Sequence, residues 1–195
     1  MLRLTPVVRN LLLINVVVFV LQWMAPMLTE YIALWGLSTG NFKPYQLFTY
    51  MFAHAGFGHI FGNMLFLVFT GPMLEDYWGQ KKFLLFYMAA GLGAAVFYML
   101  MNLFLGTDSY SMLGASGAVY GVMTAFGIVF ANMEMRLMFL PISFKAKYLV
   151  LVLGSLAIIN SFSPGAGDNV AHLAHLGGIV VAIIIILYWR SQGRY

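Results

Sequence analysis

The sequence predicts an all-α, polytopic membrane protein, and two observations carry that prediction. The 195 residues are 62% hydrophobic and only 8% charged, whereas ordinary soluble domains are about 25% charged. The apolar residues gather in six stretches, most of which reach the ~20 residues that a helix needs to cross a bilayer. A soluble fold could not bury so much apolar surface. We therefore expect a single membrane domain over residues 1–195, with no soluble part larger than a loop.

The six stretches cover residues 8–28, 59–76, 82–105, 115–133, 147–162 and 169–190. The first follows two arginines, as the apolar part of a signal peptide does. However, Ala25-Pro26 is a poor cleavage site, so we expect a retained membrane helix there. The second stretch begins after a turn at Gly56 and Gly58. The second, fourth and fifth stretches are slightly short for a span.

The basic residues predict the orientation of these spans. With the N-terminus in the cytoplasm, only Lys43 falls on the external side. The nine that fall inside are Arg3, Arg9, Lys81, Lys82, Arg136, Lys145, Lys147, Arg190 and Arg194. This bias places both termini in the cytoplasm. The net charge of +4 then reflects topology and attraction to anionic lipid rather than nucleic-acid binding.

The loop over residues 29–58 is long for so short a chain and rich in aromatic residues. Its aromatics are Tyr31, Trp35, Phe42, Tyr45, Phe48, Tyr50 and Phe52. Such residues favour the membrane interface, so the loop is expected to lie there. Packing of the loop on the helical bundle is an alternative, and the two are compatible.

Ser116 lies at the start of the fourth stretch, within Gly114-Ala115-Ser116-Gly117. The glycines permit a tight turn and leave space beside the hydroxyl. The first amides of a helix have no intrahelical partner, so the Ser116 N–H is available to an oxyanion. These features suit a nucleophile. The alternative is helix packing, because Gly117 and Gly121 form a small-xxx-small pattern.

His175 lies at a similar depth in the sixth stretch and is the candidate base. It precedes Gly177 and Gly178, which would let this helix approach the fourth. Tyr120 lies one turn after Ser116, on the same face, and could stack on the imidazole. Asp168 is expected in the preceding loop, so a Ser–His dyad is more economical than a triad. A histidine hydrogen-bonded between helices is the structural alternative.

His59 and Asn63 lie four residues apart on the second stretch, so they share one helix face. Both can donate hydrogen bonds to a developing oxyanion; the alternative is polar contact between helices. A metal site is a further alternative, because the four histidines (His54, His59, His172 and His175) all lie near one side. There is no HExxH motif and no carboxylate among them, so neither a metal nor a cofactor is expected. The chain has no cysteine, which excludes thiolate catalysis and disulfides.

Four motifs together resemble those of a known family. They are His54-x4-His59-x3-Asn63, Glu75-x3-Gly79, Gly114-Ala115-Ser116-Gly117 followed by Tyr120, and Ala174-His175-x2-Gly178. In order and spacing they resemble the rhomboid family of intramembrane serine proteases. The resemblance covers essentially the whole chain, as a minimal six-span core of the bacterial type.

The resemblance implies a six-helix rhomboid-like bundle and a role for each motif residue. Ser116 would be the nucleophile and His175 the base, while His59, Asn63 and the Ser116 amide would form the oxyanion hole. Tyr120 would stack on the base, and His54 would support the end of the second span; Gly114, Gly117 and Gly178 would allow close packing. The substrate would be a single-span membrane protein, and the fifth span would gate its lateral access. The location would be a bacterial inner membrane, with the site open to the external side.

Two positions depart from the family pattern. Tyr45-Gln46 stands where the family often has Trp-Arg, which puts the bracing of the first loop in question. Ala182 stands in place of a glycine, although close packing is expected to survive one methyl group. His172 competes with His175 as the base, but the spacing to Gly178 favours His175.

Two other function classes were weighed against a protease. A rhomboid-like protein that binds membrane clients without cutting them usually lacks the serine or the histidine, and both are present here. A small transporter or channel would need paired ionisable groups or broken helices along a pathway, whereas the polar groups here cluster at one depth. The oligomeric state cannot be predicted from the sequence.

Overall fold

A computed structural model of the chain describes residues 3–105, 111–136, 143–148, 151–152, 155 and 166–193, without the side chains of residues 105 and 166–173. Its long helices are α1 (Pro6–Met24), α4 (Phe57–Trp78), α5 (Gln80–Leu105), α6 (Ser116–Val129) and α8 (Ala166–Ser191). Within the described ranges, α1, α4, α5 and α8 each hold a segment long and apolar enough to cross a membrane. The fold is helical, as the composition predicts.

The count of six spans stays a prediction. Helix α6 has 14 residues, or roughly 21 Å at 1.5 Å per residue, which is shorter than the ~30 Å hydrocarbon core. It is therefore short for a span, as expected for the fourth apolar stretch. The expected fifth span at 147–162 lies mostly outside the described residues.

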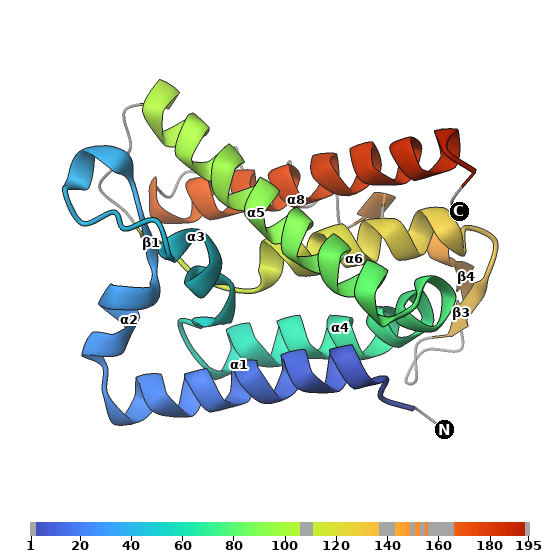
Figure 1. Ribbon diagram of the computed structural model, residues 1–195, viewed down its shortest axis with the longest axis horizontal. Helices are drawn as coiled ribbons and strands as arrows, with labels where there is room; N and C mark the ends of the chain where they lie inside the picture. Colours follow the sequence, from blue (N-terminus) through green and yellow to red (C-terminus); the bar gives the residue numbers. More distant parts are fainter. Residues whose placement is uncertain are drawn as a thin grey trace.

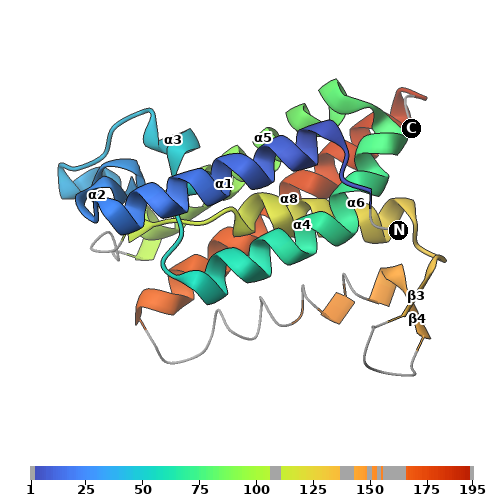
Figure 2. The ribbon, with the colours of Figure 1, turned by 90° about the horizontal axis from the view of Figure 1, so that it is seen from below.

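Helix α6 lies in the centre of the bundle. It packs against α4, α5 and α8, and Figures 1 and 2 show it enclosed by these helices. Most of its residues are buried, including Gly117, Ala118 and Gly121. Small residues at these positions let neighbouring backbones approach closely. A polar residue at the start of this helix is therefore held by several elements at once.

The first loop folds into short elements that pack on the bundle. They are α2 (Met27–Ile32), β1 (Leu34–Trp35), η1 (Leu37–Thr39), α3 (Gln46–Thr49) and η2 (Tyr50–Phe52). Strand β1 pairs antiparallel with β2 (Ser111–Met112), which directly precedes α6. A second antiparallel pair, formed by β3 (Glu134–Arg136) and β4 (Ser143–Lys145), follows α6. The alternative expectation, that the first loop packs on the bundle, is confirmed, and one of its partners is the segment that leads to Ser116. The position of the loop at the membrane interface stays a prediction.

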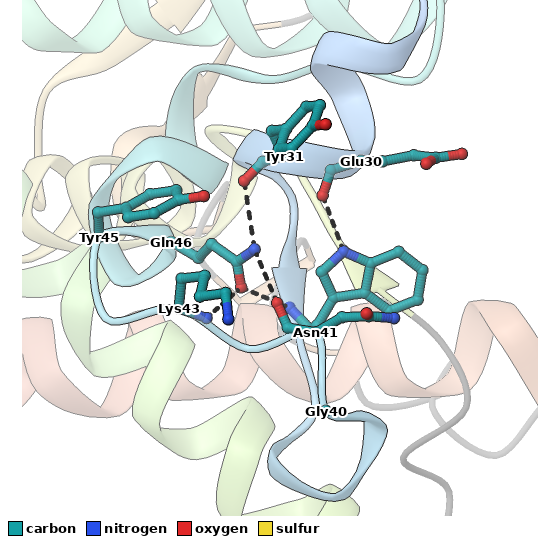
Figure 3. A pocket seen from close by; sticks show the side chains of 8 residues that line it. Glu30, Tyr31, Gly40, Asn41, Lys43, Tyr45 and Gln46 are labelled. Carbon is teal, nitrogen blue, oxygen red and sulfur yellow. Dashed lines mark hydrogen bonds between the residues drawn. The ribbon is translucent and has the colours of Figure 1, made fainter.

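Gln46 braces this loop in place of the arginine common in the family. Its buried amide donates to the Tyr31 and Asn41 carbonyl oxygens, at 3.2 and 3.3 Å (Figure 3). Its Oε1 accepts from the Lys43 amide at 3.0 Å and the Trp35 amide at 3.4 Å. One neutral side chain therefore satisfies four backbone groups of the loop. The departure at Tyr45-Gln46 leaves this loop braced.

Glu75 caps the beginning of α1. Its buried carboxylate accepts hydrogen bonds from the Val7 and Val8 amides, both at 2.9 Å, and from the Thr5 hydroxyl. The first amides of a helix lack intrahelical partners, and the helix N-terminus favours negative charge. The sequence singled out Glu75 as a family feature, and its contacts show that it joins α4 to α1.

Replacing this carboxylate is expected to destabilise the fold. Glu75→Gln keeps the size but leaves one acceptor oxygen for three donors, so we expect a loss of about 1.5–3 kcal/mol. Thermal unfolding in detergent measures the loss. The adjacent Asp76 is exposed, so Asp76→Asn serves as the matched control and should leave the melting temperature nearly unchanged. Equal shifts in the two variants would contradict the capping role.

Candidate active site

Ser116 is the first residue of α6, and the turn before it is fixed by the backbone. Gly114 has φ +125°, a conformation that L side chains rarely adopt. Its amide donates to the Tyr50 carbonyl oxygen at 2.9 Å. The turn is thus tied to the first loop through Tyr50 and through the β1–β2 pair. This arrangement presents the Ser116 hydroxyl at the N-terminus of a buried helix, where amides are unpaired and the helix dipole is positive.

His175 of α8 meets this hydroxyl. Its Nε2 lies 2.8 Å from the Ser116 Oγ, which is hydrogen-bond distance. The contact depends on the approach of α6 and α8, because a Cβ on Gly178 would lie 2.0 Å from the Gly117 carbonyl oxygen. Ala182 is fully buried, and a Cβ added to Gly121 would lie 3.7 Å from the Ala182 Cβ and 3.2 Å from the Gly178 carbonyl oxygen, so α8 lies close to α6 here too. The expected close packing at Ala182 is therefore confirmed.

Tyr120 holds the imidazole from one side. Its ring is stacked on that of His175, with centroids 4.4 Å apart and an interplanar angle of 9°. Stacking fixes the ring plane while leaving both nitrogens in position for hydrogen bonds. The predicted contact between Tyr120 and His175 is confirmed.

His59 lies on the other side of the nucleophile turn. A Cβ added to Gly114 would lie 2.7 Å from the His59 Nε2, so the imidazole occupies the space that glycine leaves. The His59 Nδ1 accepts from the Ala55 amide at 3.5 Å, a long hydrogen bond. In a neutral imidazole the proton then lies on Nε2, which faces the turn. His59 can therefore donate a hydrogen bond beside Ser116.

Asn63 is buried one turn further along the same face of α4. Its side chain is 7% exposed. Among the residues that the structure describes, its amide nitrogen has no hydrogen-bond partner. A buried donor without a partner is costly and calls for an explanation. A ligand oxygen would satisfy this donor.

His54 supports His59 from the loop before α4. The Gln22 side chain clamps the His54 backbone, donating to its carbonyl oxygen and accepting from its amide. The His54 ring is buried and lies edge-on to His59, with centroids 5.1 Å apart. Burial, and secondarily the nearby His59, lower the pKa of His54 to about 4. The ring is therefore neutral at physiological pH.

The lowered pKa of His54 predicts a loss of stability in mild acid. Above pH 6.5 the ring is neutral in both the folded and the unfolded protein. Between pH 6.5 and about 4, only the unfolded protein binds the proton, so stability falls as the pH falls. Thermal unfolding across this range should show a steeper decline for the wild type than for His54→Gln, which cannot titrate. Parallel profiles would contradict this account.

The structure thus brings together Ser116, His175, Tyr120 and His59, with His54 behind His59. Asn63 lies one turn along α4 from His59. The side chain of His172 and that of Asp168 lie outside the described residues. In the described part of the chain, no group of three His, Cys, Asp or Glu residues could hold a metal ion. Sequence reasoning missed two supporting residues, Tyr50 and Gln22. The Gln22 side chain bonds the His54 main chain, and the Tyr50 carbonyl oxygen bonds the Gly114 amide. Both contacts join residues far apart in the sequence, so no local pattern predicts them.

A family model described as the rhomboid domain matches residues 41–192. The chain belongs to the rhomboid family. With its apolar helices, this membership identifies it as an integral membrane protein.

Similar proteins come from plants and bacteria. "RHOMBOID-like protein 1" of Arabidopsis thaliana is 30% identical over 77% of this chain and 36% of its own length. "Rhomboid protease GluP" of Bacillus subtilis is 29% identical over 70% of this chain and 24% of its own length. "Putative rhomboid protease YdcA" of the same bacterium is 28% identical over 83% of this chain and 76% of its own length. The chain spans about a quarter to a half of the length of most relatives it matches.

Proposed function

We propose that this rhomboid protein is an intramembrane serine protease that cleaves single-span membrane proteins with a Ser116–His175 dyad. The observation that carries the proposal is the 2.8 Å contact between the Ser116 hydroxyl and the His175 imidazole. Such a pair is unusual among apolar helices, where polar groups are costly. Names of relatives such as "Rhomboid protease GluP" support the same activity.

The proposed reaction begins with attack by Ser116. Its Oγ bonds to the carbonyl carbon of the scissile peptide while its proton passes to the His175 Nε2, and the carbonyl electron pair moves onto the oxygen. The C–N bond then breaks, and the imidazolium returns the proton to the leaving amine. This leaves an ester between Ser116 and the acyl half of the substrate. Water, deprotonated by His175, hydrolyses the ester and regenerates the hydroxyl.

The oxyanion formed in each half-reaction needs hydrogen-bond donors. The proposed donors are the Ser116 amide at the N-terminus of α6, the His59 Nε2 and the Asn63 amide nitrogen. They approach from two helices, and the Asn63 nitrogen has no competing partner among the described residues. Preorganised donors of this kind stabilise the transition state more than the ground state.

The orientation proposed for the site follows from charge. Nine of the ten Lys and Arg residues share one side if both termini are cytoplasmic, and the site then opens to the external side. A bacterial inner membrane is the proposed location.

Cleavage in proteoliposomes tests the function. Purified protein should cut some members of a panel of single-span membrane segments, and mass spectrometry should place the new termini at one peptide bond within or beside each span. Binding of segments without any cleavage would favour the alternative, a catalytically inactive client-binding protein.

Removal of one proposed oxyanion donor is expected to slow turnover more than it weakens substrate binding. Asn63→Ala should lower kcat by up to about 10²-fold with a small change in KM. Its melting temperature should stay near that of the wild type, because the amide nitrogen loses no partner within the described residues. A large fall in melting temperature with unchanged kcat in the remaining folded protein would make Asn63 a structural contact instead.

A further inference from the structure

A cavity lined by both polar and aromatic side chains lies in the first loop, apart from the candidate active site. Its volume is about 260 Å³, and it is lined by residues of α2, β1 and the segment that leads into α3. Ligand pockets for drug-sized molecules are typically ~300–1,000 Å³, so this cavity suits a smaller group. Figure 3 shows it bounded by Tyr31, Asn41, Lys43, Tyr45 and Gln46.

The walls of this cavity are held in place before any ligand binds. The buried Gln46 side chain ties together backbone groups of Tyr31, Asn41 and Lys43, as described above. The Trp35 indole nitrogen donates to the Glu30 carbonyl oxygen at 2.9 Å, which fixes the opposite wall. A preformed site loses less conformational entropy on binding.

We expect the cavity to lie at the membrane interface. Helix α1 has 19 residues, or roughly 28 Å, close to the ~30 Å hydrocarbon core. Helix α2, which contributes to the cavity, begins three residues after α1 ends. Large apolar side chains are exposed on the short elements of the first loop, among them Met27 of α2, Leu37 of η1 and Phe48 of α3. Exposed apolar side chains on these elements fit a loop that rests among lipid headgroups.

The side chains in the cavity are hydrogen-bond donors suited to an anion. The Lys43 ammonium is a compact cation that commonly binds phosphate, and Asn41 and Tyr45 add an amide and a phenol. The carboxylate of Glu30, also at the cavity, extends away from Gln46 and Lys43 in Figure 3. We propose that this cavity binds the phosphate group of a membrane phospholipid.

Binding to the purified full-length protein in uncharged detergent tests the proposal. The ligands are phosphatidylglycerol, a diacylglycerol with the same acyl chains, and inorganic phosphate, each titrated by native mass spectrometry. We expect phosphatidylglycerol to bind in preference to the diacylglycerol. Lys43→Gln should weaken that binding about tenfold, the effect of losing one charge-assisted hydrogen bond.

Two controls separate the cavity from general charge and from a free anion. Lys81→Gln removes a basic residue at the start of α5, outside the cavity, and should leave phospholipid binding unchanged. The proposal would be overturned if Lys43→Gln and Lys81→Gln weakened phospholipid binding equally. It would also be overturned if diacylglycerol bound as tightly as phosphatidylglycerol. Lys43-dependent binding of inorganic phosphate without binding of the phospholipid would overturn it too, because the ligand would then be a free anion. Tyr45→Phe, a conservative change of a half-exposed residue, should weaken binding while size-exclusion chromatography shows folded protein.

Discussion

Ser116→Ala and His175→Ala are each expected to lower cleavage of a single-span substrate by at least about 10⁴-fold. Nucleophile and base act as one unit, so losing either removes the covalent route and costs nearly as much as losing both. The double variant should therefore be no slower than the single ones. Initial rates in proteoliposomes, corrected for the amount of inserted protein, measure this.

Two further substitutions serve as controls. Ser191→Ala removes an exposed serine on α8 that bonds only its own helix among the described contacts, and it should retain full activity. His172→Ala should retain substantial activity. An inactive His172 variant beside an active His175 variant would show that the base was assigned to the wrong histidine.

Gly178→Ala should lower activity by at least about 10²-fold, because it separates two helices. The new Cβ would lie 2.0 Å from the Gly117 carbonyl oxygen, and this neighbour is backbone, which cannot rotate away. Helices α6 and α8 must move apart, and the His175–Ser116 contact lengthens with them. Overpacking a core typically lowers the free energy of unfolding by about 1–3 kcal/mol. Because the clash here is with backbone, we expect a loss at or above the upper end of that range.

Gly62→Ala is the matched control for this substitution. Gly62 is also a helical glycine, on α4, but a Cβ there meets nothing within 4 Å. Alanine should keep or slightly raise stability at Gly62, because it is the better helix former. Activity should persist in the Gly62 variant and fall by at least about 10²-fold in the Gly178 variant, as expected for a misplaced catalytic pair. Equal activity in both variants would contradict the proposed role of the α6–α8 contact.

The residues of the candidate site could be predicted from the sequence because each carries a local signal. Polar side chains in apolar stretches are conspicuous, and a spacing of four places His59 and Asn63 on one helix face. The small residues around His175 and Ser116 predicted that their helices approach. Tyr120 lies four residues after Ser116 on the same helix face, which predicted that its ring could stack on His175.

The supports of the site could not be predicted, because they depend on contacts between distant parts of the chain. Strand β1 pairs with β2 across 76 to 78 residues, and neither two-residue strand has a recognisable pattern. The Tyr50 carbonyl that holds Gly114 is a main-chain group, which every residue possesses. The sequence put the bracing of the first loop in question because Gln46 stands where the family often has an arginine. In the structure, the neutral amide of Gln46 makes hydrogen bonds to the backbone of the loop. The sequence motif identified Glu75 but not its hydrogen-bond partners, which lie on and just before α1.

Reaction with a fluorophosphonate probe tests most directly the central claim, that His175 activates the Ser116 hydroxyl. The purified wild-type protein should form one covalent adduct, and peptide mapping should place it on Ser116. Ser116→Ala should form none, and His175→Ala should react far more slowly although folded. An adduct on another serine, or equal labelling of Ser116 with and without His175, would contradict the account.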